Sequence, residues 1–99
     1  MTITNQQEGT TLTMTIEGRI DTQTSPEFGK AIESMPDEIT SLVLDFTDVF
    51  YLSSAGLRAV LTAQNKMNAK NGEMVIRGAG KNIVSVFKVT GFDTFLNLV

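Results

Sequence analysis

Four stretches of the chain carry the hydrophobic pattern of β-strands. In residues 10–18, threonines alternate with apolar side chains, which is typical of a strand with one buried face. Residues 39–46 are almost continuously apolar, and this predicts a central strand covered on both faces. The other two expected strands are shorter: an edge strand at residues 3–4, before a turn at residues 6–9, and a strand at residues 74–77.

Apolar residues recur at helical spacing in three further stretches, which predicts three helices. The first is expected to start with Ser25 as its N-cap, and the third to be capped by Asn82. The second and longest helix is expected to start at Ser53 or Ser54. The apolar residues 92–98 are expected to form a short helical turn or a strand on the core.

Strands that alternate with helices in this order predict an α/β fold, as a single domain over residues 1–99. The expected sheet is mixed and mostly parallel, with helices mainly on one face and the other face partly open. In such sheets functional loops gather at the carboxyl ends of the parallel strands. The segment before Ser54 is expected to lie there as a loop, turned by Asp45, Thr47 and Asp48.

The composition narrows the possible function classes. The chain has neither histidine nor cysteine, so the commonest general base and thiolate chemistry are both absent. A net charge of −3, with scattered lysines and arginines, argues against tight nucleic-acid binding. No apolar run is long enough to span a membrane and no signal-peptide pattern is present, so we expect a cytoplasmic protein without a membrane partner. These features favour a binding or regulatory domain over an enzyme.

Two adjacent serines, Ser53 and Ser54, stand at the expected start of the longest helix. A hydroxyl at this place can cap unpaired backbone N–H groups, or it can carry a phosphate that the helix dipole accommodates. The spacing alone favours a cap. However, Ala55 and Gly56 leave the helix start sterically open, and no Glu or Gln completes a capping box. On the residues alone, both interpretations remain open.

Three motifs occur together along the chain. The most specific is Leu52-Ser-Ser-Ala-Gly-Leu-Arg58, which follows an apolar strand. The weaker two are Gly18-Arg-Ile-Asp21 before the first helix and Asn71-Gly-Glu-Met74 before the last strand, with a helix after it that ends at Gly91. In their order, and over nearly the whole chain, they resemble the STAS domain, specifically the stand-alone bacterial anti-sigma factor antagonists.

The resemblance implies a mixed sheet flanked by helices and a function as an anti-sigma factor antagonist. In that family the partner anti-sigma factor is also a serine kinase, and the serine that it phosphorylates corresponds here to Ser54. Ser53 stands where the family usually has Asp, and it is the alternative acceptor. The partner-binding residues implied by the resemblance are Asp21, Ser53, Ser54, Ala55, Gly56 and Arg58.

The resemblance implies no catalytic residue, metal or cofactor in this chain, because ATP and magnesium would belong to the kinase. A PP2C-type phosphatase is the expected second partner. Two alternatives stay open: a STAS interaction module of another signalling assembly, and a small enzyme that uses Asp21, Asp45 and Asp48. Short acidic residues at strand ends are ordinary turn formers, which weighs against the enzyme. Of Phe50 and Tyr51, one is expected in the core and the other at the surface.

Overall fold

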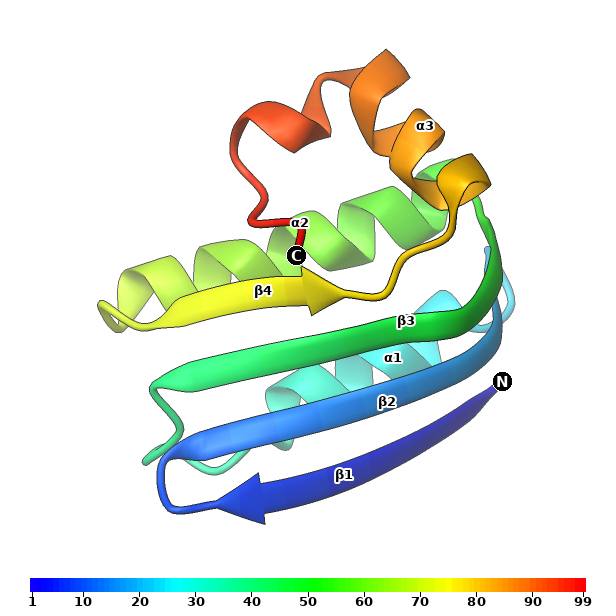
Figure 1. The fold of residues 1–99 in the computed structure, drawn as a ribbon. Helices are drawn as coiled ribbons and strands as arrows, with labels where there is room; N and C mark the ends of the chain where they lie inside the picture. The colour runs from blue at the N-terminus through cyan, green and yellow to red at the C-terminus, as the bar shows by residue number, and fades with distance from the viewer.

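The computed structural model describes all 99 residues, and its elements follow the predicted order of two strands and then alternating helices and strands. Figure 1 shows these elements from the N-terminus in blue to the C-terminus in red. Their bounds are β1 (Thr2–Glu8), β2 (Thr11–Ile20), α1 (Ser25–Glu33), β3 (Ser41–Leu52), α2 (Ser54–Ala69), β4 (Glu73–Arg77), α3 (Lys81–Thr90) and the short 3-10 helix η1 (Phe92–Thr94).

The four strands lie in one sheet in the order β1-β2-β3-β4, so each strand pairs with its neighbour in sequence (Figure 1). β1 runs antiparallel to β2, whereas β2, β3 and β4 are parallel. The predicted mixed, mostly parallel α/β sheet is therefore confirmed. The first strand is longer than expected, because β1 continues through Glu8 and the chain turns at Gly9, where φ is +61°.

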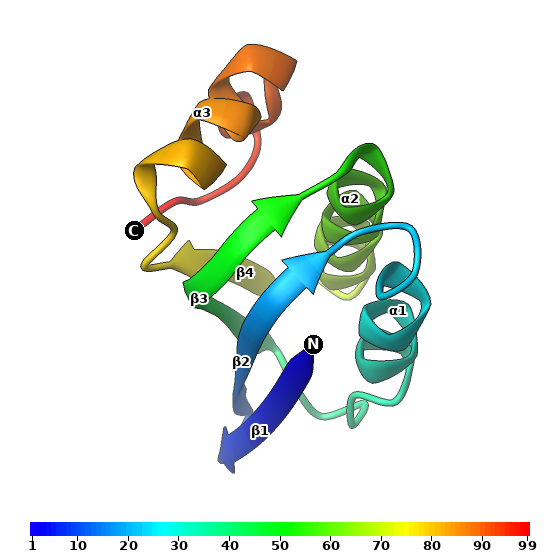
Figure 2. The ribbon, with the colours of Figure 1, turned by 90° about the vertical axis from the view of Figure 1, so that its right-hand side faces the viewer.

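Helices α1 and α2 lie together on one side of the sheet, and α3 lies apart from α1 (Figure 2). The apolar side chains of the central strands form the core with these helices: Leu12, Met14, Ile16, Leu42, Leu44, Phe46, Met74 and Ile76. On the opposite face, Thr13, Val43 and Val75 are only half-buried. The partly open face is as predicted, but complete cover on both faces of β3 was a wrong expectation.

β3 does not end at Phe46, as was expected. It runs on to Leu52, and two extra residues on β3 interrupt its pairing with β2. The flanking pairs are Thr15–Asp45 and Glu17–Asp48 at the first irregularity, and Gly18–Val49 and Arg19–Tyr51 at the second. The predicted turn is therefore a bulged strand. Each bulge shifts the inward position by one residue, so that Phe46, Val49 and Leu52 are buried at intervals of three.

The starts of two helices differ from the predicted caps. The N-cap of α1 is Thr24, not Ser25, whose hydroxyl donates instead to the carbonyl oxygen of Asp21. The N-cap of α3 is Gly80, while the Asn82 side-chain amide donates to the carbonyl oxygen of Phe50, at 3.1 Å. Both polar side chains bind backbone in neighbouring segments rather than their own helix. None of the helices is both long and apolar enough to cross a membrane.

After η1, the last residues return to the sheet beside β4. The Ile76 N–H donates to the Asn97 carbonyl oxygen at 2.8 Å, and the Val99 N–H donates to the Ile76 carbonyl oxygen at 2.9 Å. Leu98 forms a parallel bridge with Ile76. The tail thus contains both of the alternatives expected for it, a short helical turn and a strand-like segment.

Candidate functional site

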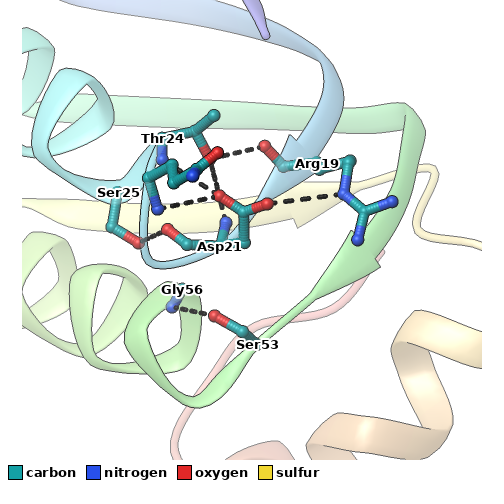
Figure 3. A network of polar contacts seen from close by, with 7 residues as sticks. Arg19, Asp21, Thr24, Ser25, Ser53 and Gly56 are labelled. Atoms are coloured by element: carbon teal, nitrogen blue, oxygen red, sulfur yellow. Dashed lines mark hydrogen bonds and ion pairs between the residues drawn. The ribbon is translucent and has the colours of Figure 1, made fainter.

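The two serines at the start of α2 have different environments. Ser53 is the N-cap: its backbone is extended, and its hydroxyl oxygen accepts from the Gly56 N–H at 3.3 Å (Figure 3). Ser54 is the first residue of the helix, and its side chain is exposed without a hydrogen bond in the chain. The capping function therefore belongs to Ser53, and the hydroxyl of Ser54 is free at the positive end of a long helix.

The start of α2 is fixed against the end of β2. The Ser53 N–H donates to the Ile20 carbonyl oxygen at 3.0 Å. Gly56 lies so close to the same carbonyl that a Cβ atom there would meet it, and such an atom would be 2.7 Å from Cδ1 of Leu52. Gly56 is thus needed for packing, and it brings the two serines next to the segment that holds Asp21.

Asp21 organises the turn between β2 and α1. Its Oδ1 accepts from the backbone N–H groups of Gln23 and Thr24, both at 3.0 Å, and from the Thr24 hydroxyl at 3.1 Å (Figure 3). Its Oδ2 accepts from Arg19 Nε at 3.4 Å. These hydrogen bonds hold the pKa of the Asp21 carboxyl below its usual value of 3.8, and the bond from the Thr24 N–H contributes most. Desolvation of the carboxylate acts in the opposite direction.

This lowered pKa predicts a contribution of Asp21 to acid sensitivity. Because the carboxylate is favoured in the folded chain, its stabilisation is present above the unfolded-state value of 3.8 and is lost as the pH falls through the lower folded-state value. Asp21→Asn is therefore expected to flatten the fall in unfolding free energy below about pH 4. Urea unfolding at a series of pH values measures this slope.

The matched control is Asp93→Asn, which removes an exposed carboxylate that accepts no hydrogen bond in the chain. It shows how much of any change comes from the loss of one negative charge alone. An Asp21→Asn variant with the same acid slope as the wild type would contradict the assignment.

Two aromatic rings lie exposed beside this turn. Phe50 is 58% and Tyr51 is 43% exposed, so the expectation that one of them enters the core is wrong. The two bulges of β3 explain the difference: the first places Val49 inward instead of Phe50, and the second places Leu52 inward instead of Tyr51. The Arg19 guanidinium lies over both rings, 4.6 Å from the Tyr51 centroid and 5.9 Å from that of Phe50.

A groove of about 340 Å³ runs between α1 and α2, next to the serines. Ala55 and Ala59 line it from α2, and Gly29 lines it from α1. Arg58 is its only charged lining residue. Ala55 and Arg58, both predicted as partner-binding residues, thus lie on one surface with Ser54 at its end.

The structure brings together most of the predicted site residues. The Ile20 carbonyl joins the segment of Asp21 to Ser53 and Gly56, and Ala55 and Arg58 follow on the same helix. The other aspartates are elsewhere: Asp45 pairs with Arg77 at 2.9 Å on the sheet. No group of three His, Cys, Asp or Glu side chains is placed to hold a metal ion.

Sequence reasoning gave no role to Arg19. Its period-two spacing from Glu17 only marks it as a residue of the polar face, and its contacts depend on the bulge in the neighbouring strand. Thr24 was missed in the same way. The Asp21-x-x-Thr24 spacing, typical of a side chain that binds backbone N–H groups two and three residues on, was the available signal.

Several known proteins are similar to this chain. An anti-sigma-B factor antagonist from Listeria monocytogenes is 27% identical over 84 residues, which are 84% of this chain and 74% of that protein. The structure of an anti-sigma factor antagonist from Mycobacterium paratuberculosis matches with a TM-score of 0.86 at 24% identity, over 98% of this chain and 83% of that one.

The Bacillus protein SpoIIAA matches at 16% identity in two solved forms. The TM-score is 0.76 for its unphosphorylated form, over 99% of this chain and 88% of that one. For its phosphorylated form the TM-score is 0.70, over 99% of this chain and 91% of that one. At these identities, the similarity to the SpoIIAA structures and to the Mycobacterium structure shows the fold alone. A family model of the STAS domain matches residues 2–99, so the chain belongs to the STAS domain family.

Proposed function

We propose that this chain is an anti-sigma factor antagonist that is switched by phosphorylation of Ser54. In its unphosphorylated form it binds an anti-sigma factor, which leaves the sigma factor free for transcription. The observation that carries the proposal is the division of roles at the start of α2: Ser53 caps the helix, and the exposed hydroxyl of Ser54 remains available. The similarity to proteins named anti-sigma factor antagonists supports it.

A phosphate on Ser54 would leave the fold intact. It adds a charge of about −1.5 to −2 at the first residue of a helix, where the dipole and the free N–H groups favour an anion. The cap itself is unaffected, because it uses the hydroxyl of Ser53. A partner packed against a neutral serine would instead have to desolvate a dianion, and so would bind less tightly.

The partner contributes the chemistry of the switch. The anti-sigma factor acts as the serine kinase and brings ATP and magnesium, and a PP2C-type phosphatase restores the hydroxyl. The contact surface comprises the turn of Asp21 and the first turns of α2, from Ser53 to Arg58. The exposed rings of Phe50 and Tyr51 extend it, since aromatic side chains are enriched where proteins bind one another.

Phosphorylation is expected at one site. With ATP, magnesium and an anti-sigma factor kinase of the same organism, the purified chain should gain a single phosphate that mass spectrometry maps to Ser54. Ser54→Ala should abolish this labelling, whereas Ser53→Ala should keep it. The control is Ser85→Ala, on the exposed side of α3. Labelling that survives Ser54→Ala and disappears in Ser53→Ala would move the acceptor to Ser53.

A charge on residue 54 is expected to weaken the complex without unfolding the chain. Ser54→Asp should lower the affinity for the unmodified anti-sigma factor at least about tenfold, an effect of roughly 1.4 kcal/mol, as measured by titration calorimetry. Ser54→Asn has a similar shape without the charge and should bind more tightly than Ser54→Asp. Equal affinities of Ser54→Asp and the wild type would contradict the charge switch.

A further inference from the structure

The groove between α1 and α2 holds one charged group, and that group has no partner in the chain. Two of its hydroxyls are already engaged, since Ser25 donates to the Asp21 carbonyl oxygen and Thr62 to the Arg58 carbonyl oxygen. The guanidinium of Arg58 makes neither an ion pair nor a hydrogen bond within the chain. The groove therefore offers an apolar floor and one free cation.

Arg58 differs in this respect from the other arginines. Arg19 is paired with Asp21 at 3.4 Å and Arg77 with Asp45 at 2.9 Å. Both of these have a carboxylate partner in the folded chain, and Arg58 has none. A planar cation at the rim of an apolar groove complements a carboxylate on an apolar partner segment.

Arg58 also lies within reach of Ser54. The two residues are four apart in α2, so their side chains lie on the same side of the helix, with Cβ atoms about 5–6 Å apart. A phosphate on Ser54 and a carboxylate in the groove would both bind the same guanidinium. Only one of them can bind it bidentately at a time.

We propose that the α1–α2 groove receives an acidic, amphipathic segment of the anti-sigma factor, whose carboxylate pairs with Arg58, and that a phosphate on Ser54 takes Arg58 away from this partner. The inference rests on the proposed function and specifies the contact through which the switch acts. Phosphorylation then weakens the complex twice: it adds a dianion at the interface, and it withdraws the cation that held the partner.

A comparison of Arg58→Ala with the wild type, before and after phosphorylation, tests the competition. Titration calorimetry uses the kinase that labels the chain, with a nonhydrolysable ATP analogue. Before phosphorylation, Arg58→Ala should weaken binding roughly 10- to 100-fold, the value of a charge-assisted hydrogen bond. After phosphorylation its effect should be much smaller, because Arg58 has already left the partner. Lys88→Ala, an exposed cation on α3, is the charge-matched control and should leave both affinities nearly unchanged.

Other results would overturn the inference. An Arg58→Ala variant that binds normally before phosphorylation and worse after it would make Arg58 a simple counter-ion of the phosphate. Equal losses in both states would make it a constant contact. If phosphorylation of the wild type does not weaken the complex, the proposed function fails, whatever Arg58 does.

Gly29 allows a second test of the groove itself. A Cβ atom at Gly29 would meet nothing within 4 Å, and Gly29 lines the groove, so we expect a larger side chain there to occupy part of the groove. Gly29→Leu is expected to raise the melting temperature, because leucine favours the helix, and yet to weaken unphosphorylated binding more than about tenfold. A variant that is at least as stable as the wild type and binds equally well would exclude docking in the groove.

Discussion

Gly56→Ala is expected to lower the free energy of unfolding by about 3 kcal/mol, the upper part of the usual range for overpacked sites. Its methyl group would meet the Ile20 carbonyl oxygen and lie 2.7 Å from the Leu52 side chain. The carbonyl cannot move cheaply, because it also accepts the hydrogen bond from Ser53. The start of α2 would have to shift away from β2, and urea unfolding followed by circular dichroism measures the loss.

Gly29→Ala is the matched control for this prediction, since Gly29 is also a helical glycine but has open space around it. There the same change should stabilise the chain by about 0.5–1 kcal/mol, the helix propensity of alanine over glycine. A lower free energy of unfolding for Gly56→Ala and a higher one for Gly29→Ala would separate the effect of packing from that of helix propensity. If both substitutions stabilise the chain, the close approach of α2 to Ile20 is not rigid.

The bulged course of β3 predicts the second large effect. Val49 is 4% exposed in the core, and Val49→Asp is expected to cost at least about 3 kcal/mol, from lost apolar burial and from an unpaired buried carboxylate. A domain of this kind has about 5–15 kcal/mol of stability in all, so the variant should be close to unfolded. Thermal unfolding by calorimetry provides the measurement.

Phe50→Asp is the control, because it places the same carboxylate one residue further along the strand, on the exposed side. It should cost less than about 1 kcal/mol, the value of the lost contact with Arg19. An unbulged strand would reverse the two results: continued alternation from Leu42, Leu44 and Phe46 points Phe50 inward and Val49 outward. A larger loss for Phe50→Asp would therefore contradict the first bulge, between Asp45 and Asp48.

The order of the elements and the face that each buries were predictable from local pattern. The alternation in residues 11–16 and the helical spacing in α2 each have one period, and a single period identifies one buried face. The left-handed residue Asn71, with φ of +57°, closes the turn after α2, as an Asn-Gly pair beyond a helical pattern predicts. These features depend on residues close together in the chain, which is why one sequence was enough.

The bulges were not predictable in the same way. Asp45, Thr47 and Asp48 have the composition of a turn, and Asp45 does bind the Thr47 N–H as a turn residue would. What keeps the strand going is its pairing with β2, a contact between distant segments. Phe50 and Tyr51 were consequently misplaced, because the side of a strand to which a residue points changes with every inserted residue.

At the site, the motif located the serine pair, but only the three-dimensional arrangement distinguishes its members. Either serine fits a cap by spacing, and the choice of Ser53 follows from where α2 meets the end of β2. Whether Arg58 is paired likewise depends on the fold. The carboxylates of Asp21 and Asp45 pair with Arg19 and Arg77 instead.

The sequential order of the strands has a consequence for how the chain acquires its function. The serine pair, the turn of Asp21 and the groove all derive from residues 19–62, the part of the chain that is synthesised before β4. Contacts between neighbouring elements form faster than distant ones, and folding during synthesis proceeds from the N-terminus. We expect the surface around the serine pair and the groove to assemble early, while β4, α3 and the C-terminal segment complete the fold afterwards.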